Sequence, residues 1–307
     1  KSSAMNMFLL VPSILFFFIY RALMRRSDKL TAGSRSTQGG LSLPRTRCGS
    51  VGWLALIGSG LFFVLTLLQY GCVLLSGFLK SKKGVYSFTL DHWNELWSIG
   101  ASPVVRSVVY ALIVAVVGTL FAALFAYYMD RRRVPGRAFF DCIATMPYML
   151  PGTCFGIGYI LAFNHAPLKL TGTAIIVLAN MLFKHLPTSA KICSATLAQL
   201  QPAQERSAQD LGAGRLAVIR DVVLPNMRPA LLSCFVYNFT SSMTTAGAII
   251  FLIDPSRQLA VFRLFDAVYR GDYALASVLA SVITAIVLAV EGLVWLLSRK
   301  EGKRRVS

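Results

Sequence analysis

Residues 103–129 read PVVRSVVYALIVAVVGTLFAALFAYYM, an apolar run in which Arg106 is the one charged residue. A run of about 20 such residues crosses the hydrocarbon core of a bilayer as a helix. The whole chain is similar: of 307 residues, 55% are hydrophobic and 14% charged, and the mean hydropathy is +0.61. Soluble domains carry about 25% charged residues. The composition excludes a water-soluble enzyme, a disordered chain and a disulfide scaffold, and predicts an all-α, polytopic membrane helix bundle.

Outward from this run, other apolar stretches follow at similar spacing. Seven spans are predicted, at Met5–Leu23, Val51–Leu79, Pro103–Met129, Phe139–Phe163, Gly172–Ser189, Pro229–Ile253 and Tyr273–Leu297. The fifth is the least apolar, because Lys184, His185 and Pro187 interrupt its second half. The fourth contains Pro147, Pro151 and Gly152. Such a broken helix either is a packing kink or lines a cavity, since exposed backbone is not tolerated in lipid.

The basic residues give the orientation. Loops rich in Lys and Arg stay in the cytoplasm, and seven spans place four basic clusters on one side: residues 21–47, 131–137, 191–228 and 299–305. We therefore expect a multi-pass membrane protein, in contact with lipid, with a cytoplasmic C-terminus. The net charge of +18 is explained by these topology signals, so no nucleic-acid partner is expected.

The chain divides into four parts by composition. Residues 1–23 form a transmembrane helix, interpreted as the last helix of an upstream module, although an ordinary extra helix at a true N-terminus is the alternative. Residues 24–50 are a basic, flexible cytoplasmic linker rich in Ser, Thr and Gly. Residues 51–300 form the main transmembrane domain, with a long cytoplasmic loop at 196–229, and residues 301–307 are a basic tail.

No catalytic pattern occurs in the sequence. It lacks the GxxxxGK[ST] phosphate loop, HExxH and GxSxG, and its six cysteines are scattered without ligand spacing. We therefore expect no enzyme activity, no metal site and no bound cofactor. The acidic residues Asp130, Asp141 and Glu291 fall near predicted span ends. A proton-coupled carrier would place an ionisable residue at mid-membrane, so energy for uphill transport would come from another subunit.

The loop at 196–229 has internal order. Pro202 favours a helix start, and Glu205 places a carboxylate in the first turn, where the helix dipole stabilises it. Gly212 is predicted to end this helix. Its Ala203, Ser207, Ala208 and Leu211 share one face, which suits docking into a groove of another protein. A second amphipathic stretch runs through Leu216, Ile219, Val222, Val223 and Leu224 as far as Pro225 and Pro229.

This loop resembles the EAA loop of binding-protein-dependent ABC importer permeases. The resemblance is carried by Leu211-Gly212-Ala213, Val222-Val223-Leu224-Pro225 and Arg228-Pro229-Ala230, with the family's spacing from Gly212 to Pro225. The spans from about Val51 to Leu297 have the order of a six-helix type I permease module, here preceded by one extra transmembrane helix. One departure is clear: the family's Glu-Ala-Ala falls on Arg206-Ser207-Ala208, and Glu205 lies one position early.

The resemblance implies that this chain provides the membrane pathway and that a separate subunit hydrolyses ATP. In the family, the loop forms a coupling helix that sits in a cleft of a cytoplasmic ABC ATPase dimer, which uses ATP and Mg and drives two permease modules. The corresponding residues here are Glu205, Arg206, Ser207, Ala208, Asp210, Leu211, Gly212, Ala213, Leu224 and Pro225. A bulky residue at Gly212 is then expected to abolish transport without disturbing the membrane fold.

Candidate pathway residues lie in two spans. Hydroxyl side chains crowd the sixth span, and prolines break the fourth. Some of these residues face the solute pathway and others hold helices together, because the run covers more than two helical turns. The candidates are Pro147, Tyr148, Pro151, Asn238, Thr240, Ser241, Ser242, Thr244 and Thr245.

Only a resemblance to one branch of the permease family indicates the solute. The preceding span, the basic linker, and the stretches Ser242–Thr245 and Ala248–Leu252 before Pro255 resemble the C-terminal module of fused ferric-iron permeases. Iron is the leading solute, and phosphonate, sugar phosphate, thiamine or polyamine is the alternative. The outer loop Asp254–Asp272 would meet a periplasmic or extracellular substrate-binding protein. An ion-coupled secondary transporter, a membrane-embedded enzyme and a structural subunit are rival classes.

Overall fold

The computed structural model describes residues 15, 18, 19, 50–82, 85–94, 101–132, 134–165 and 169–304. The predicted span Met5–Leu23 and the linker 24–50 therefore lie outside the described residues, apart from a few helical positions. The elements in chain order are α2 (Ser50–Ser76), β1 (Leu79–Lys82), β2 (Val85–Phe88), α4 (Ser102–Arg131), α5 (Arg137–Met149), α6 (Gly152–Phe163), α7 (Ala174–Leu197), α8 (Pro202–Asp210), α9 (Arg215–Ala217), η1 (Val218–Val223), α10 (Leu224–Asn226), α11 (Arg228–Thr244), α12 (Ile249–Leu252), η2 (Pro255–Arg257), α13 (Ala260–Tyr269) and α14 (Tyr273–Arg304).

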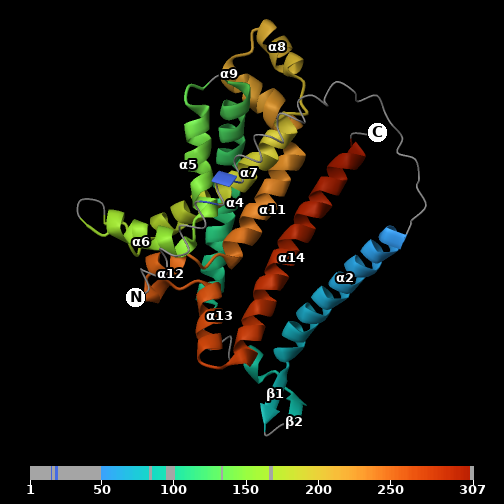
Figure 1. The fold of residues 1–307 in the computed structure, drawn as a ribbon, viewed down its shortest axis with the longest axis vertical. Helices are drawn as coiled ribbons and strands as arrows, with labels where there is room; N and C mark the ends of the chain where they lie inside the picture. The colour runs from blue at the N-terminus through green and yellow to red at the C-terminus, as the bar shows by residue number, and fades with distance from the viewer. Residues whose placement is uncertain are drawn as a thin grey trace.

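Three helices form the centre of the bundle. α4 packs against both α7 and α11, and α14 packs on α11 and α13 (Figure 1). The buried face of α4 is built from small residues, namely Ala111, Ala115, Gly118, Ala122, Ala123 and Ala126. Small side chains let helix backbones approach closely where lipid supplies no hydrophobic driving force between helices. α2 contacts α14 at the end next to the hairpin, and the two helices diverge from there (Figure 1).

The apolar helices account for several of the predicted spans. In the described part of the chain, three helices are long and apolar enough to cross a membrane: Gly52–Ser76, Ser102–Arg131 and Tyr273–Arg299. A fourth crossing is possible if the bent pair α5–α6 counts as one span. α7 carries buried Asn180, His185 and Ser189, and α11 is shorter. The buried polar side chains of α7 and α11 are covered by neighbouring helices. A test on length and apolar composition therefore does not count these two helices as spans.

Two predicted spans are interrupted. The run Phe139–Phe163 is two helices with an angle of 111° between them. Pro151 stands at the break as the residue before α6, and its ring cannot continue the preceding helix. The run Pro229–Ile253 is helical only to Thr244, where Thr245 is extended (φ −74°, ψ 122°) and α12 follows. The fifth span continues through Pro187 to Leu197.

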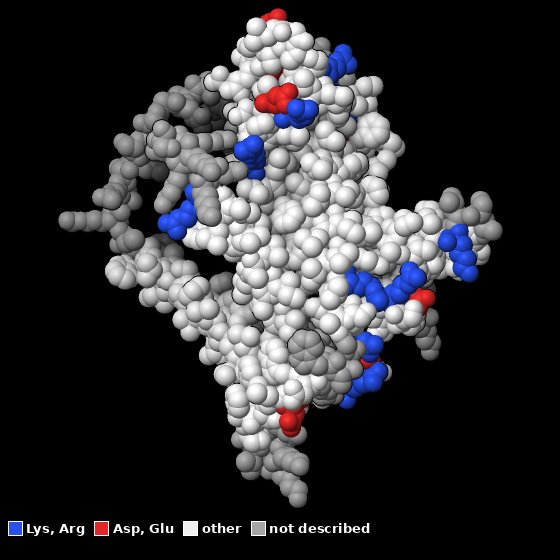
Figure 2. Space-filling model, turned by 180° about the vertical axis from the view of Figure 1, so that it is seen from behind, with Lys and Arg blue, Asp and Glu red and all other residues white. Residues whose placement is uncertain are grey.

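The hairpin and α13 form the end of the bundle opposite α8 (Figure 1). β1 and β2 pair antiparallel, with Leu79 opposite Phe88, a small sheet that the all-α expectation did not include. In the segment leading to α13, the hydroxyl and backbone N–H of Ser256 lower the pKa of the Asp254 carboxyl. On the face in Figure 2, charged side chains lie near the end that carries α8 and along one side of the opposite half, and most of the remaining surface is uncharged, as expected of helices that face lipid.

Candidate functional site

The segment from Pro202 to Ala213 folds as the sequence predicts. α8 begins at Pro202, whose missing N–H costs nothing in the first turn, and Glu205 lies in that turn. At its other end, Gly212 takes φ +87°. Gly212 N donates to Gln209 O (2.9 Å) and Ala213 N donates to Ala208 O (3.0 Å). This pair of bonds is a Schellman cap, which needs a residue that accepts positive φ.

Glu205 fastens α8 to the rest of the bundle. Its Oε1 lies 3.0 Å from Arg131 Nε, and its Oε2 accepts a hydrogen bond from Tyr127 Oη (3.1 Å). Arg131 Nη2 also donates to Leu197 O (2.8 Å) and Leu200 O (2.6 Å) at the end of α7. The Arg131 and Glu205 side chains are only 16% and 13% exposed. One arginine therefore joins α4, the end of α7 and α8.

An apolar base lies under the same loop. Val218, Ile219, Val223 and Met227 are buried in one cluster with α4, α7 and α11 residues, including Tyr127, Cys193, Leu197 and Cys234. Ala208, Ala213, Val222 and Leu224 pack against it. The second amphipathic stretch is thus confirmed as a buried layer, although Leu216 points away from it and is 81% exposed. Residues 218–223 form a π-helix.

No other described segment covers the outer side of α8. Arg206, Ser207 and Asp210 are exposed, and Leu211 is 89% exposed. α8 lies at the extremity of the molecule (Figure 1). Glu205 faces inward and Arg206 outward, so the shift of the Glu by one position places the carboxylate on this chain's own Arg131. Pro225 lies in α10, in partial contact with solvent.

The sixth-span candidates separate into two groups. Asn238 is 1% exposed: Ser189 Oγ donates to its Oδ1 (2.8 Å), and its Nδ2 donates to Thr119 Oγ1 (3.2 Å). It therefore ties α11 to α7 and α4. Thr245 is also buried and bonds Nε2 of His185 (3.2 Å). Ser242 is 3% exposed, and its Oγ has no hydrogen-bond partner among the described residues.

The second group of sixth-span candidates lines a groove or lies on the surface. Thr240 and Ser241 line a groove between α11 and α14. Thr244 is exposed, and its Oγ1 bonds the carbonyls of Thr240 and Ser241. In the bent pair, Pro147 lies within α5, Tyr148 is 57% exposed and Pro151 stands at the bend. The structure does not bring the α5 and α11 candidates into one site.

Sequence reasoning missed the anchoring side chains. Arg131 belongs to a basic cluster that indicates only topology, Tyr127 lies inside an apolar run, and Met227 stands between Asn226 and Arg228 with no pattern to mark it. An arginine within one turn of a span end, with an acidic residue in a later loop on the same predicted side of the membrane, is the signal that points to such an ion pair. Within the described residues, no group of three or more His, Cys, Asp or Glu is placed to hold a metal ion.

Comparison with known proteins identifies the family. The model described as binding-protein-dependent transport system inner membrane component matches residues 115–301. The chain belongs to this family. The family of transport permeases, together with the apolar helices, establishes a multi-pass membrane protein, and the all-α permease fold is confirmed.

Among curated proteins, the chain is similar to ferric and sulfate transport permeases. The chain is 28% identical over 296 residues to the ferric transport system permease protein FbpB of Actinobacillus pleuropneumoniae, which covers 94% of this chain and 42% of that protein. It is 30% identical over 272 residues to the putative ferric transport system permease protein FbpB 1 of Haemophilus influenzae, covering 86% and 42%. It is 29% identical over 273 residues to the sulfate transport system permease protein CysT of Salmonella typhimurium, covering 83% and 95%. The chain thus spans less than half the length of the ferric relatives.

Solved structures share the fold. A chain in the crystal structure of a bacterial alginate ABC transporter, in complex with an alginate pentasaccharide-bound periplasmic protein, superposes with a TM-score of 0.62. The sequences are 17% identical, and the match covers 81% of this chain and 93% of that chain. The likeness establishes the permease fold and no more.

Proposed function

We propose that this permease forms the solute pathway of a bacterial ATP-driven importer and is moved by a cytoplasmic ABC ATPase dimer through residues 203–225. The observation that carries the proposal is α8, a capped helix at the extremity of the bundle with exposed Leu211. ATP and Mg are used by the partner subunit. The other partners are a second permease module and a substrate-binding protein outside the inner membrane, and the C-terminus is cytoplasmic.

The anchoring of α8 supports a mechanical role. A docking helix transmits movement only if it is rigidly attached to the spans, and Arg131, Glu205 and Tyr127 supply that attachment through a nearly buried ion pair and hydrogen bonds. The apolar base of Val218, Val223 and Met227 adds a second connection to α4 and α7. A force on α8 is therefore delivered to two central helices at once.

Ferric iron is the proposed solute, because the two ferric relatives match most of this chain. The sulfate and 2-aminoethylphosphonate permeases are also similar, so an oxyanion importer is the second candidate. Sugar phosphate, thiamine and polyamine are further alternatives within the class, and an ion-coupled secondary transporter is the more distant one.

The test is uptake of radioactive Fe³⁺ by proteoliposomes that contain the assembled transporter. With the binding protein supplied, we expect uptake that requires ATP and persists when ion gradients are collapsed. Sulfate and 2-aminoethylphosphonate should not compete. Uptake driven by an imposed ion gradient without ATP would contradict the importer proposal, and competition by either anion would contradict the choice of iron.

A further inference from the structure

Glu291 is an acidic residue within the long apolar helix α14. The sequence predicts a span at Tyr273–Leu297 with Glu291 near its end; in the structure α14 continues to Arg304, and the part long and apolar enough to cross a membrane is Tyr273–Arg299. Along the helix axis, Glu291 lies about 12 Å from Arg299 and about 27 Å from Tyr273. By length and composition, Glu291 therefore lies inside the candidate span, about two helical turns from its Arg299 end. An ionisable side chain at such depth is costly and commonly marks an ion or substrate pathway.

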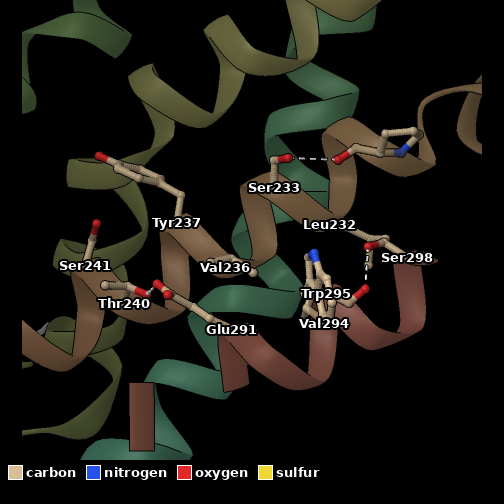
Figure 3. Close-up of a pocket in the computed structure, with 11 residues that line it drawn as sticks. Leu232, Ser233, Val236, Tyr237, Thr240, Ser241, Glu291, Val294, Trp295 and Ser298 are labelled. Carbon is tan, nitrogen blue, oxygen red and sulfur yellow. Dashed lines mark hydrogen bonds between the residues drawn. The ribbon is translucent and has the colours of Figure 1, made fainter. Parts of the chain in front are cut away.

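The Glu291 side chain faces a groove between α11 and α14 (Figure 3). The groove has a volume of about 650 Å³, which is within the range of small-ligand sites. Its oxygen-bearing lining residues are Ser233, Tyr237, Thr240, Ser241, Glu291 and Ser298. Thr240 Oγ1 donates to Glu291 Oε1 (3.3 Å), and Trp295 lies one turn further along α14.

The Glu291 carboxylate has no cationic partner among the residues that the structure describes. The ion pairs of the described residues involve Arg131, Arg137, Arg220 and Arg270, each with another acid. Thr240 is the one hydrogen-bond partner that Glu291 has there. Lys184, a half-buried cation on α7, is not a residue of the groove. The negative charge thus has room beside it for a positive ligand.

We propose that the α11–α14 groove binds a hard, oxygen-preferring cation, with the Glu291 carboxylate as its charged ligand and Thr240 as a neighbouring oxygen donor. Such cations prefer carboxylate and hydroxyl oxygens. The same carboxylate repels oxyanions, so the groove distinguishes a metal cation from sulfate or phosphonate. This proposal rests on the proposed function and deepens it, because it assigns a cationic substrate class to a defined part of the pathway.

Tb³⁺ is a suitable probe, because it is a hard cation whose emission is sensitised by a nearby indole, and Trp295 lines the groove. The experiment titrates Tb³⁺ into the purified full chain in lipid nanodiscs. We expect saturable sensitised emission, and Glu291→Gln should weaken Tb³⁺ binding by about tenfold or more. Trp295→Phe should remove the emission while calorimetry still detects binding.

The matched control is Asp266→Asn on α13, which removes a carboxylate that is paired with Arg270 outside the groove. It should leave Tb³⁺ affinity unchanged. Equal binding by wild type and Glu291→Gln, or an equal loss in Asp266→Asn, overturns the site. Because no ATPase is present, such a failure leaves ATP-driven uptake untouched. In the assembled transporter, Glu291→Gln should slow Fe³⁺ uptake at unchanged subunit association; loss of association instead assigns Glu291 to a subunit contact and also overturns the site.

Discussion

At the C-terminal end of α4, Arg131 interacts with backbone carbonyls and a carboxylate from two other segments of the chain. Its guanidinium donates to the carbonyls of Leu197, the last residue of α7, and Leu200 beyond it, and pairs with the carboxylate of Glu205. Nearly buried charges are costly to leave unpaired, whereas exposed pairs contribute little. Arg137 provides the contrast, since it pairs with Asp130 at 2.6 Å but is 58% exposed. The two arginines therefore have similar partners and different energetic consequences.

Arg131→Ala should lower the free energy of unfolding by roughly 3 kcal/mol, because it strands the Glu205 carboxylate beside Tyr127. The measurement is thermal unfolding of the purified chain in detergent, together with the rate of proteolysis within α8. Arg137→Ala is the control and should change stability by less than about 1 kcal/mol. Equal effects of the two substitutions would show that the Arg131 contacts do not hold α8.

Gly212 is constrained by its backbone conformation. A Cβ on Gly212 would meet no atom within 4 Å, but its φ is +87°. Gly212→Ala should therefore cost about 1 kcal/mol in the cap of α8, even though the alanine side chain is small. Faster hydrogen exchange of α8 amides would show the loss. Gly214→Ala is the control, since Gly214 has φ −67° and open space around it; matching exchange rates in both variants would refute the argument.

At the scale of elements, α6 and α12 meet through glycines. A Cβ on Gly152 would lie 2.9 Å from Ala248 N, and one on Gly156 would lie 2.7 Å from Phe251 Cδ2 and 2.9 Å from Ala248 O. The spacing of four residues puts both glycines on one face of α6, the arrangement that lets membrane helices pack closely. These contacts fix the bend after Pro151 against the break that follows α11.

Gly156→Ala should separate α6 from α12 and destabilise the chain by about 1–3 kcal/mol, as overpacking does. Thermal unfolding in detergent measures the effect. The control is Gly158→Ala in the same helix, where a Cβ would have nothing within 4 Å. If both variants unfold at the wild-type temperature, the close approach of α6 and α12 does not contribute to stability.

The sequence predicts elements better than it predicts contacts between them. Apolar runs located α2, α4 and α14, and Pro202 with Gly212 located both ends of α8. The breaks after Met149 and Thr244 could not be positioned, since they depend on α6 packing against α12. Similarly, Asn238 and Thr240 are two residues apart in one polar run, but which of them faces the interior depends on the neighbouring helices.

For the whole molecule, α8 and α13 lie at opposite ends of the bundle (Figure 1). The proposed orientation places Leu211 in the cytoplasm and Tyr269, which is 92% exposed, outside. In a cysteine-free background, a cysteine at position 269 should react with an impermeant maleimide on intact spheroplasts. A cysteine at position 211 should react only in inside-out vesicles. The reverse pattern would invert the topology and remove α8 from any cytoplasmic ATPase.

The importer assignment depends on contact between α8 and an ATPase subunit, and cysteine crosslinking in the assembled transporter measures that contact directly. We predict that a cysteine at Leu211 crosslinks to the ATPase and that the yield changes when ATP is added. A cysteine at Leu161, which is 71% exposed on α6 away from α8, should give no crosslink. If position 211 fails to crosslink in a complex that still hydrolyses ATP and imports solute, coupling does not pass through α8.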